Sequence, residues 1–334
     1  MPFSNRVANE YCVLFKAPLC VESVPCPFLR SPCQTADAVR FIIWVLCGET
    51  ASKIILLLVK RLLSLILNQP IERDNAENRR SSRTVESRTR SFRGRAHQGD
   101  AVDPPGLGDS APPADGQYDT ASVANILHQL VLKLGLSKII YVGHDVGVWI
   151  GYNYGALYGS EGVAHLTVQH PGSFRQSAVQ ADPWDPIWVT RSWHFFFNQL
   201  ENLPEQLTAG HEREYLTWWF RSKALRPECF TDQEIEAYYH EYSRPNRLTQ
   251  GWAYYRAIPR TAKINRQFAA KPLAMPVLAI GGSNSAGLNL ARAIAQSTPD
   301  VVGEVIAESG HFAPEEQPER TAAVLLGALN AANL

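Results

Sequence analysis

The segment YVGHDVGVWIGY, Tyr141–Tyr152, decides the fold. Its β-rich first residues, up to Val142, predict a strand, and the residues from Gly147 to Tyr158 predict a helix. The letters G-H-D-V-G between them place Asp145 at the centre of a sharp turn, with a glycine two residues away on each side. Small residues there let strand and helix approach while the central side chain points into a pocket.

A carboxylate at this turn is suited to covalent chemistry. The N-terminus of the following helix offers backbone N–H groups and the positive end of a dipole, which favour an ionised Asp145. Such a carboxylate can attack carbon and form an ester, which divides one difficult displacement into two easier steps. The plainer interpretation is that Asp145 only caps the helix.

The rest of the C-terminal two thirds alternates between strand and helix patterns. Apolar residues repeat at helical spacing from Val123 to Leu134, and Gly135 ends that helix. The alternation predicts a mostly parallel sheet with crossover helices. Further strands are expected at Val163–Val168, Met275–Ile280 and Val301–Ile306, with helices at Leu288–Gln296 and after the last strand.

A segment rich in aromatic and charged residues, 173–260, interrupts this alternation with helical periodicity, and we expect an inserted helical cap. The second chemical candidate, His311, follows the last predicted strand in the segment Ser309–Phe312. An imidazole with a near-neutral pKa can take a proton from water. In enzymes that carry a nucleophile on a strand–turn–helix of this kind, the histidine base follows the nucleophile in chain order. A solvent-exposed turn histidine is the alternative.

From about Val102 onward, the chain resembles the α/β-hydrolase superfamily, and within it the branch of epoxide hydrolases and dehalogenases that use an aspartate nucleophile. Several segments carry the resemblance in the same order: DPPGLGDSAPP (Asp103–Pro113), GHDVG, SWHFFF (Ser192–Phe197), AYYRAIP (Ala253–Pro259), PVLAIGG (Pro276–Gly282) and ESGHFAPEEQPE (Glu308–Glu319).

The resemblance implies roles for individual residues. Asp145 would be the nucleophile and His311 the base that activates water, while the backbone N–H of Val146 would form half of an oxyanion hole. Tyr255 would donate to the epoxide oxygen, which becomes an alkoxide as the carbon is attacked. A second donor would come from His194, with Tyr215 in reserve. The residues expected to line the substrate site are His144, Trp149, Trp193, His194 and Tyr215.

Three features depart from the family pattern. No Asp or Glu stands where the acid that orients the histidine is expected, because those places hold Gln169-His170-Pro171 and Ser283-Asn284-Ser285. Neither Val146 nor Trp149 supplies the halide-binding or carboxylate-binding groups of dehalogenases. No His-Gly-x-Pro loop precedes Asp103, so the N-terminal part of the sheet is expected to be missing or replaced, and an error in the gene's reading frame is an alternative.

We therefore divide the chain into an unmatched segment, 1–99, a hydrolase core, 100–172 and 261–334, and the cap, 173–260. The unmatched segment carries two apolar runs, Phe41–Cys47 and Ile54–Leu67, which are expected to form buried or interfacial helices. Glu72–Arg95 has the composition of a disordered linker.

The equal numbers of acidic and basic residues (32 each) argue against a nucleic-acid partner. Six cysteines without CxxC spacing argue against a zinc site, and we expect a cytoplasmic protein. A membrane contact through residues 41–67 is the less favoured alternative, and the oligomeric state stays open.

The resemblance thus implies an epoxide hydrolase that needs no cofactor or metal. Aromatic residues dominate the cap, which favours a small apolar substrate (Trp193, Phe195, Phe196, Trp218 and Trp219). One alternative is a haloalkane or haloacid dehalogenase-like hydrolase. Another is an inactive relative that acts as a binding protein.

Overall fold

The computed structural model describes six stretches of the chain. The stretches are residues 41–47, 90–93, 98–136, 139–169, 186–269 and 271–331.

Seven described strands form one sheet in the order β2-β3-β1-β4-β5-β6-β7. β2 pairs antiparallel with β3, and every other neighbouring pair is parallel. The mostly parallel sheet is therefore confirmed. The bounds are β1 (Phe41–Cys47), β2 (Arg90–Arg93), β3 (Gln98–Val102), β4 (Ile139–Asp145), β5 (Val163–Gln169), β6 (Val277–Gly282) and β7 (Val301–Ile306).

The first apolar run is a strand, so the expectation of a helix at Phe41–Cys47 is wrong. β1 lies between β3 and β4, with Ile42 opposite Ile140 and Cys47 opposite Asp145. A run of seven apolar residues suits a parallel strand with both faces covered, and it is too short for a typical helix. The N-terminal segment therefore contributes strands to the sheet, and β1 ends beside the turn that carries Asp145.

The linker expected at Glu72–Arg95 also needs a correction, because Arg90–Arg93 forms β2 at the edge of the sheet. Polar and charged residues are tolerated in an edge strand, where they discourage pairing with other chains. The second apolar run, Ile54–Leu67, and the rest of the linker lie outside the described residues. Within the described part, no helix has the length and apolar character needed to cross a membrane.

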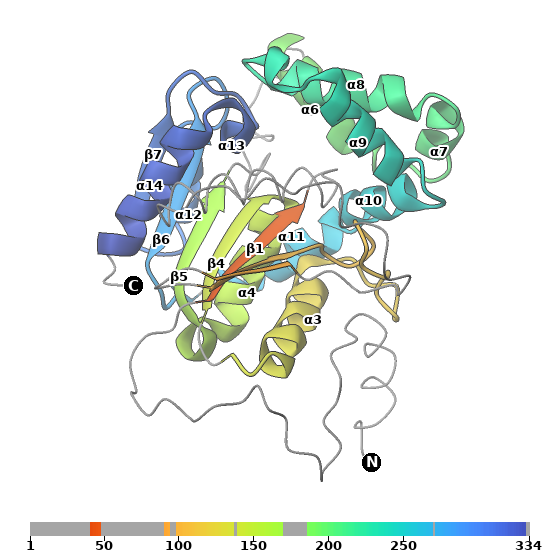
Figure 1. The fold of residues 1–334 in the computed structure, drawn as a ribbon. Helices are drawn as coiled ribbons and strands as arrows, with labels where there is room; N and C mark the ends of the chain where they lie inside the picture. Colours follow the sequence, from red (N-terminus) through yellow and green to blue (C-terminus); the bar gives the residue numbers. More distant parts are fainter. Residues whose placement is uncertain are drawn as a thin grey trace, which may run out of the picture.

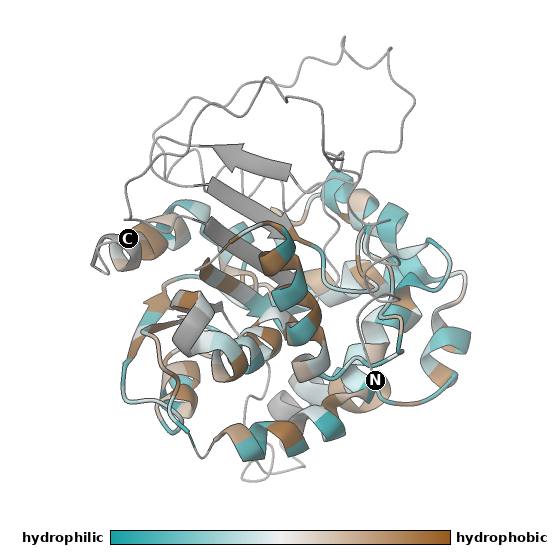
Figure 2. Cartoon of the chain, turned by 90° about the horizontal axis from the view of Figure 1, so that it is seen from below, coloured by the Kyte–Doolittle hydropathy of each residue, from teal (hydrophilic) through white to brown (hydrophobic). Residues whose placement is uncertain are grey.

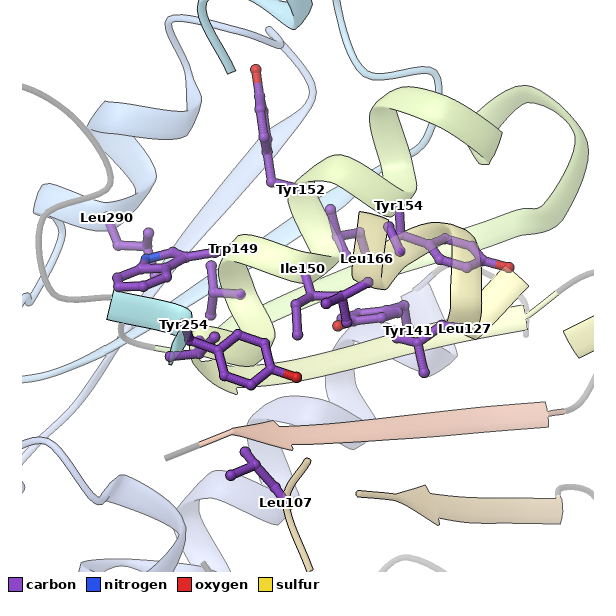
Figure 3. Close-up of a cluster of buried hydrophobic side chains, with 14 of the residues drawn as sticks. Leu107, Leu127, Tyr141, Trp149, Ile150, Tyr152, Tyr154, Leu166, Tyr254 and Leu290 are labelled. Atoms are coloured by element: carbon purple, nitrogen blue, oxygen red, sulfur yellow. The ribbon is translucent and has the colours of Figure 1, made fainter. Parts of the chain in front are cut away.

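The helix α4 (Val146–Gly162) packs against the central strands β4 and β5, and α3 (Thr120–Lys133) packs against α4. α3 begins at Asp119, whose side chain accepts the N–H of Ser122, and ends just before Gly135, which has a φ of +69°. In Figure 3, Tyr141 of β4 lies with Leu127 and Ile150 in the buried cluster around α4. The C-terminal part adds α12 (Asn289–Ile294), α13 (Ala313–Glu316) and α14 (Pro318–Ala331).

The described part of the segment between β5 and β6, which begins at Pro186, is largely helical, as predicted. Figure 1 shows its helices α6 to α10 grouped beyond the ends of the strands, while α11 lies near the sheet and contacts α3 and α4. Figure 2 shows that these helices carry both hydrophilic and hydrophobic residues. The bounds are α6 (Pro186–Phe197), α7 (Leu203–Thr208), α8 (Glu212–Lys223), the 3-10 turn η3 (Pro227–Cys229), α9 (Asp232–Tyr242), α10 (Arg247–Arg256) and α11 (Ile258–Phe268).

Candidate active site

Asp145 is the last residue of β4 and stands in a strained backbone conformation, with φ 52° and ψ −119°. Non-glycine residues rarely adopt positive φ, and such strain concentrates at functional turns. The turn also requires its first glycine, because a Cβ on Gly143 would lie 2.5 Å from the carbonyl oxygen of Gly147. The sequence predicted this tight approach of strand and helix.

The carboxylate of Asp145 faces a histidine and does not cap the helix. No hydrogen bond joins its side chain to the first turn of α4, although Asp145 occupies the N-cap position. Its Oδ2 lies instead 3.2 Å from Nε2 of His311, and the two residues are only 6% and 9% exposed. The structure therefore rejects two plainer interpretations: a capping aspartate and a solvent-exposed histidine.

The backbone of His311 is anchored on both sides. Its N–H donates to the carbonyl oxygen of Lys223 at 3.1 Å, at the end of α8 in the cap. Its carbonyl oxygen lies 3.0 Å from Nε2 of His144, which must carry the proton of that bond because a carbonyl only accepts. His144, expected to contact substrate, thus holds the loop of the candidate base.

The surroundings of His311 favour its neutral form. Burial lowers the pKa of His311 well below its usual value, and the nearby His144 and Lys223 lower it further. Burial also lowers the pKa of His144, against the opposing charge of Asp145. A neutral imidazole can accept a proton, which is what a base at this position requires.

Two residues predicted to line the substrate site, Trp149 and His194, meet the predicted donor Tyr255 in one aromatic cluster. The ring of Tyr255 lies 6.2 Å from Trp149, 6.1 Å from His194 and 5.8 Å from Phe195, measured between ring centroids. Trp149 stands four residues after Asp145 on α4, whereas the other three come from cap helices α6 and α10. The cap therefore brings its predicted donors against the helix that begins at Asp145.

Lys223 is a site residue that the sequence did not reveal. Its Nζ lies 3.3 Å from Nδ1 of His194 and 4.3 Å from the ring centroid of Trp219. In the sequence it is only a basic residue in the last turn of a helix, a common position for lysine. Its proximity to His311 depends on how the cap sits on the core.

The other predicted positions have different surroundings. Trp193 packs against Trp218, and the hydroxyl of Tyr215 lies 3.4 Å from the side-chain oxygen of Asn198. Phe196 and Trp218 are 58% and 45% exposed, so these two do not belong to the buried aromatic set. Val146 is buried at the first position of α4, where its backbone N–H belongs to the helix N-terminus.

The structure describes only some of the positions where an orienting acid is expected. Asn284 is exposed and reaches the histidine loop through its backbone N–H, which donates to the carbonyl oxygen of Ser309 at 2.9 Å. Gln169 ends β5, and His170 and Pro171 lie outside the described residues. Among the described residues, no three or more His, Cys, Asp or Glu side chains form a group that could hold a metal ion.

Comparisons with known proteins identify the fold family of the chain. The family model of the alpha/beta hydrolase fold matches residues 97–318. A soluble epoxide hydrolase of Corynebacterium sp. (strain C12) is 29% identical over 226 residues, which cover 66% of this chain and 76% of that protein. Epoxide hydrolase 1 of Caenorhabditis elegans is 28% identical over 211 residues, but the match covers 60% of this chain and only 50% of that protein.

Among solved structures, Cfl2 of Burkholderia cenocepacia matches with a TM-score of 0.71 and 32% identity, over 87% of this chain and 88% of that one. The epoxide hydrolase CorEH matches with a TM-score of 0.68 and 22% identity, over 88% and 92% of the two chains. At that identity CorEH supports the fold alone. The chain belongs to the α/β-hydrolase fold family and is distantly related to epoxide hydrolases.

Proposed function

We propose that the protein hydrolyses epoxides through a covalent ester on Asp145. One observation carries the proposal: a buried carboxylate at a strained turn lies 3.2 Å from the buried imidazole of His311. The similarity to epoxide hydrolases supports the choice of substrate class.

In the first half-reaction, a carboxylate oxygen of Asp145 attacks an epoxide carbon and the carbon–oxygen bond of the ring breaks. The electron pair of that bond goes to the ring oxygen, which takes a proton from the hydroxyl of Tyr255 with a hydrogen bond from His194 in support. The partners of Tyr255 in the aromatic cluster favour a mostly apolar substrate.

In the second half-reaction, His311 takes a proton from water, and the resulting hydroxide attacks the ester carbonyl carbon. The N–H of Val146 stabilises the oxyanion that forms. The bond between the Asp145 carboxyl and the diol then breaks, and the diol oxygen takes the proton from His311. Asp145 is left as a carboxylic acid, and its proton returns to the oxygen of Tyr255, which restores both groups for the next turnover. Once Asp145 is esterified its charge is gone, so burial and Lys223 keep His311 neutral and therefore able to accept a proton from water.

Trapping the ester tests the proposal. His311→Gln retains alkylation but loses the base, so intact-protein mass spectrometry after mixing with an apolar epoxide should show the mass of the protein plus one substrate. Asp145→Asn is the matched control, with no adduct and at least about 1,000-fold less turnover.

A single turnover of the wild type in heavy-oxygen water should label the peptide that contains Asp145. Turnover without label and without a trapped adduct would exclude the covalent route. If a panel of epoxides and haloalkanes gives no turnover while the protein unfolds cooperatively, the result would favour the alternative, an inactive relative that acts as a binding protein.

A further inference from the structure

A second buried carboxylate, Glu316, lies beside the histidine loop. Glu316 is the last residue of α13 and is 3% exposed. Its two oxygens accept four backbone N–H groups: Leu225 at 2.7 Å, Arg226 at 2.9 Å, Gly310 at 2.9 Å and Phe312 at 3.1 Å. An ionised carboxylate withdrawn from water needs such partners, and charge-assisted bonds of this kind are the stronger class.

The four donors belong to two segments distant in sequence. Gly310 and Phe312 flank His311 directly, and Leu225 and Arg226 follow the last turn of α8 in the cap. One side chain therefore connects both neighbours of the candidate base to the cap.

The contact between the two segments is close. A Cβ on Gly310 would lie 2.6 Å from both the backbone nitrogen of Leu225 and the carbonyl oxygen of Lys223. The N–H of His311 itself donates to that same carbonyl oxygen. The backbone N–H groups of three consecutive residues, 310 to 312, are thus fixed by Glu316 and by the end of α8.

We propose that Glu316 is the positioning residue of the base: it fixes His311 through the backbone on either side and so sets where the imidazole stands relative to the ester on Asp145. The inference rests on the function proposed above. Glu316 does not touch the reacting atoms, so its effect falls on the half-reaction that needs His311 in place. Formation of the ester needs only Asp145 and the donors to the epoxide oxygen.

The experiment separates the two half-reactions by rapid quench and intact-protein mass spectrometry. Glu316→Gln keeps the shape of the side chain but turns one acceptor oxygen into an NH₂ group that faces N–H donors. We expect ester hydrolysis to slow roughly 10–100-fold, as expected when a catalytic group is displaced by up to about 1 Å. Alkylation should change less than about threefold, so the ester accumulates during turnover.

Glu315→Gln is the matched control, because it makes the same chemical change at the preceding residue of α13. Glu315 does not take part in the hydrogen bonds between Glu316 and the residues beside His311. Burial raises the pKa of Glu315 to about 8, so a neutral amide resembles its protonated form at neutral pH. This variant should hydrolyse the ester at the wild-type rate.

Glu316→Asp keeps the charge but shortens the side chain. It should show an intermediate accumulation of ester, and it takes the place of Glu316→Gln if that variant fails to unfold cooperatively. Equal slowing of both half-reactions in the folded variants, or no slowing of either, would overturn the positioning role. If His311→Gln traps no ester, the proposed function itself fails and this inference fails with it.

Discussion

Two of the contacts between the cap and the hydrolase core use side chains of opposite charge. At the first, cap arginines donate to core carbonyls: Arg247 Nη1 lies 2.9 Å from the oxygen of Gly106 and 3.0 Å from that of Ser110. At the second, the core carboxylate of Glu316 accepts the N–H groups of Leu225 and Arg226 from the cap.

The two contacts also differ in exposure and in what lies next to them. The first includes the side chain of Arg244, which is 36% exposed and pairs with Asp109, so water and salt weaken it. The second is buried and adjoins His311. We therefore expect the first to hold the cap in place and the second to affect the chemistry as well.

The largest difference between the two contacts is expected when a glycine at each contact is replaced by alanine, which adds one methyl group. Gly310→Ala places a Cβ 2.6 Å from two backbone atoms, which cannot move away cheaply, and should reduce the free energy of unfolding by about 3 kcal/mol. Gly251→Ala, in α10 at the first contact, meets only Leu107 Cδ2 at 3.9 Å and should stabilise the helix by about 0.5–1 kcal/mol. Urea unfolding of both variants measures the difference. Similar losses at both positions would contradict it.

The next largest effect is expected from Arg247→Met, which removes the donor to two carbonyl groups. Hydrogen bonds to charged groups contribute about 1.5–3 kcal/mol, so the free energy of unfolding should fall by about 2 kcal/mol. The ratio of ester hydrolysis to alkylation should not change, because this contact does not adjoin His311. A selective loss of hydrolysis would show that the first contact positions the base too.

The parts of the candidate site that depend on local sequence patterns could be predicted from the sequence. The turn at Asp145 follows from glycine spacing, and the histidine follows from its place after a strand. Glu316 and Lys223 could not be predicted in this way, because each acts on His311 through contacts between the cap and the core.

The N-terminal strands were harder to predict for a different reason. A short apolar run such as Phe41–Cys47 has no periodicity that separates strand from helix, and its true state depends on the strands that flank it in the sheet. β2 consists largely of polar residues, and its pairing with β3 prevails over a composition typical of linkers.

The pH dependence of the free energy of unfolding tests a partly buried carboxyl group at the first contact, that of Asp103. Burial, with the charges of Asp109 and Glu241, raises the pKa of Asp103 to about 7, although Arg247 and the N–H of Asp109 oppose the rise. The folded state then binds this proton more tightly than the unfolded chain. The stabilisation is complete below the unfolded pKa of about 4 and is lost as the pH rises to about 7.

Asp103→Asn should remove this loss, which amounts to on the order of 1–2 kcal/mol because the side chain is partly screened by solvent. Thermal unfolding between pH 4 and pH 7 measures it, and a variant that is as pH-dependent as the wild type would contradict the assignment. Ester hydrolysis by the variant at fixed pH should stay at the wild-type rate.

The smallest effect concerns the charge of Lys223, which belongs to the second contact. Its ammonium group lowers the pKa of His311, in addition to burial and His144, so Lys223→Met should raise that pKa. The rate of ester hydrolysis rises with pH as His311 loses its proton, and this rising limb of the pH–rate profile should move to higher pH by less than about one unit.

Lys223→Arg retains the charge and should leave the rising limb in place, as should Arg247→Met. If the methionine and arginine variants of Lys223 shift the limb equally, the cause is packing against Trp219 and not charge, and the two contacts would then differ in geometry alone.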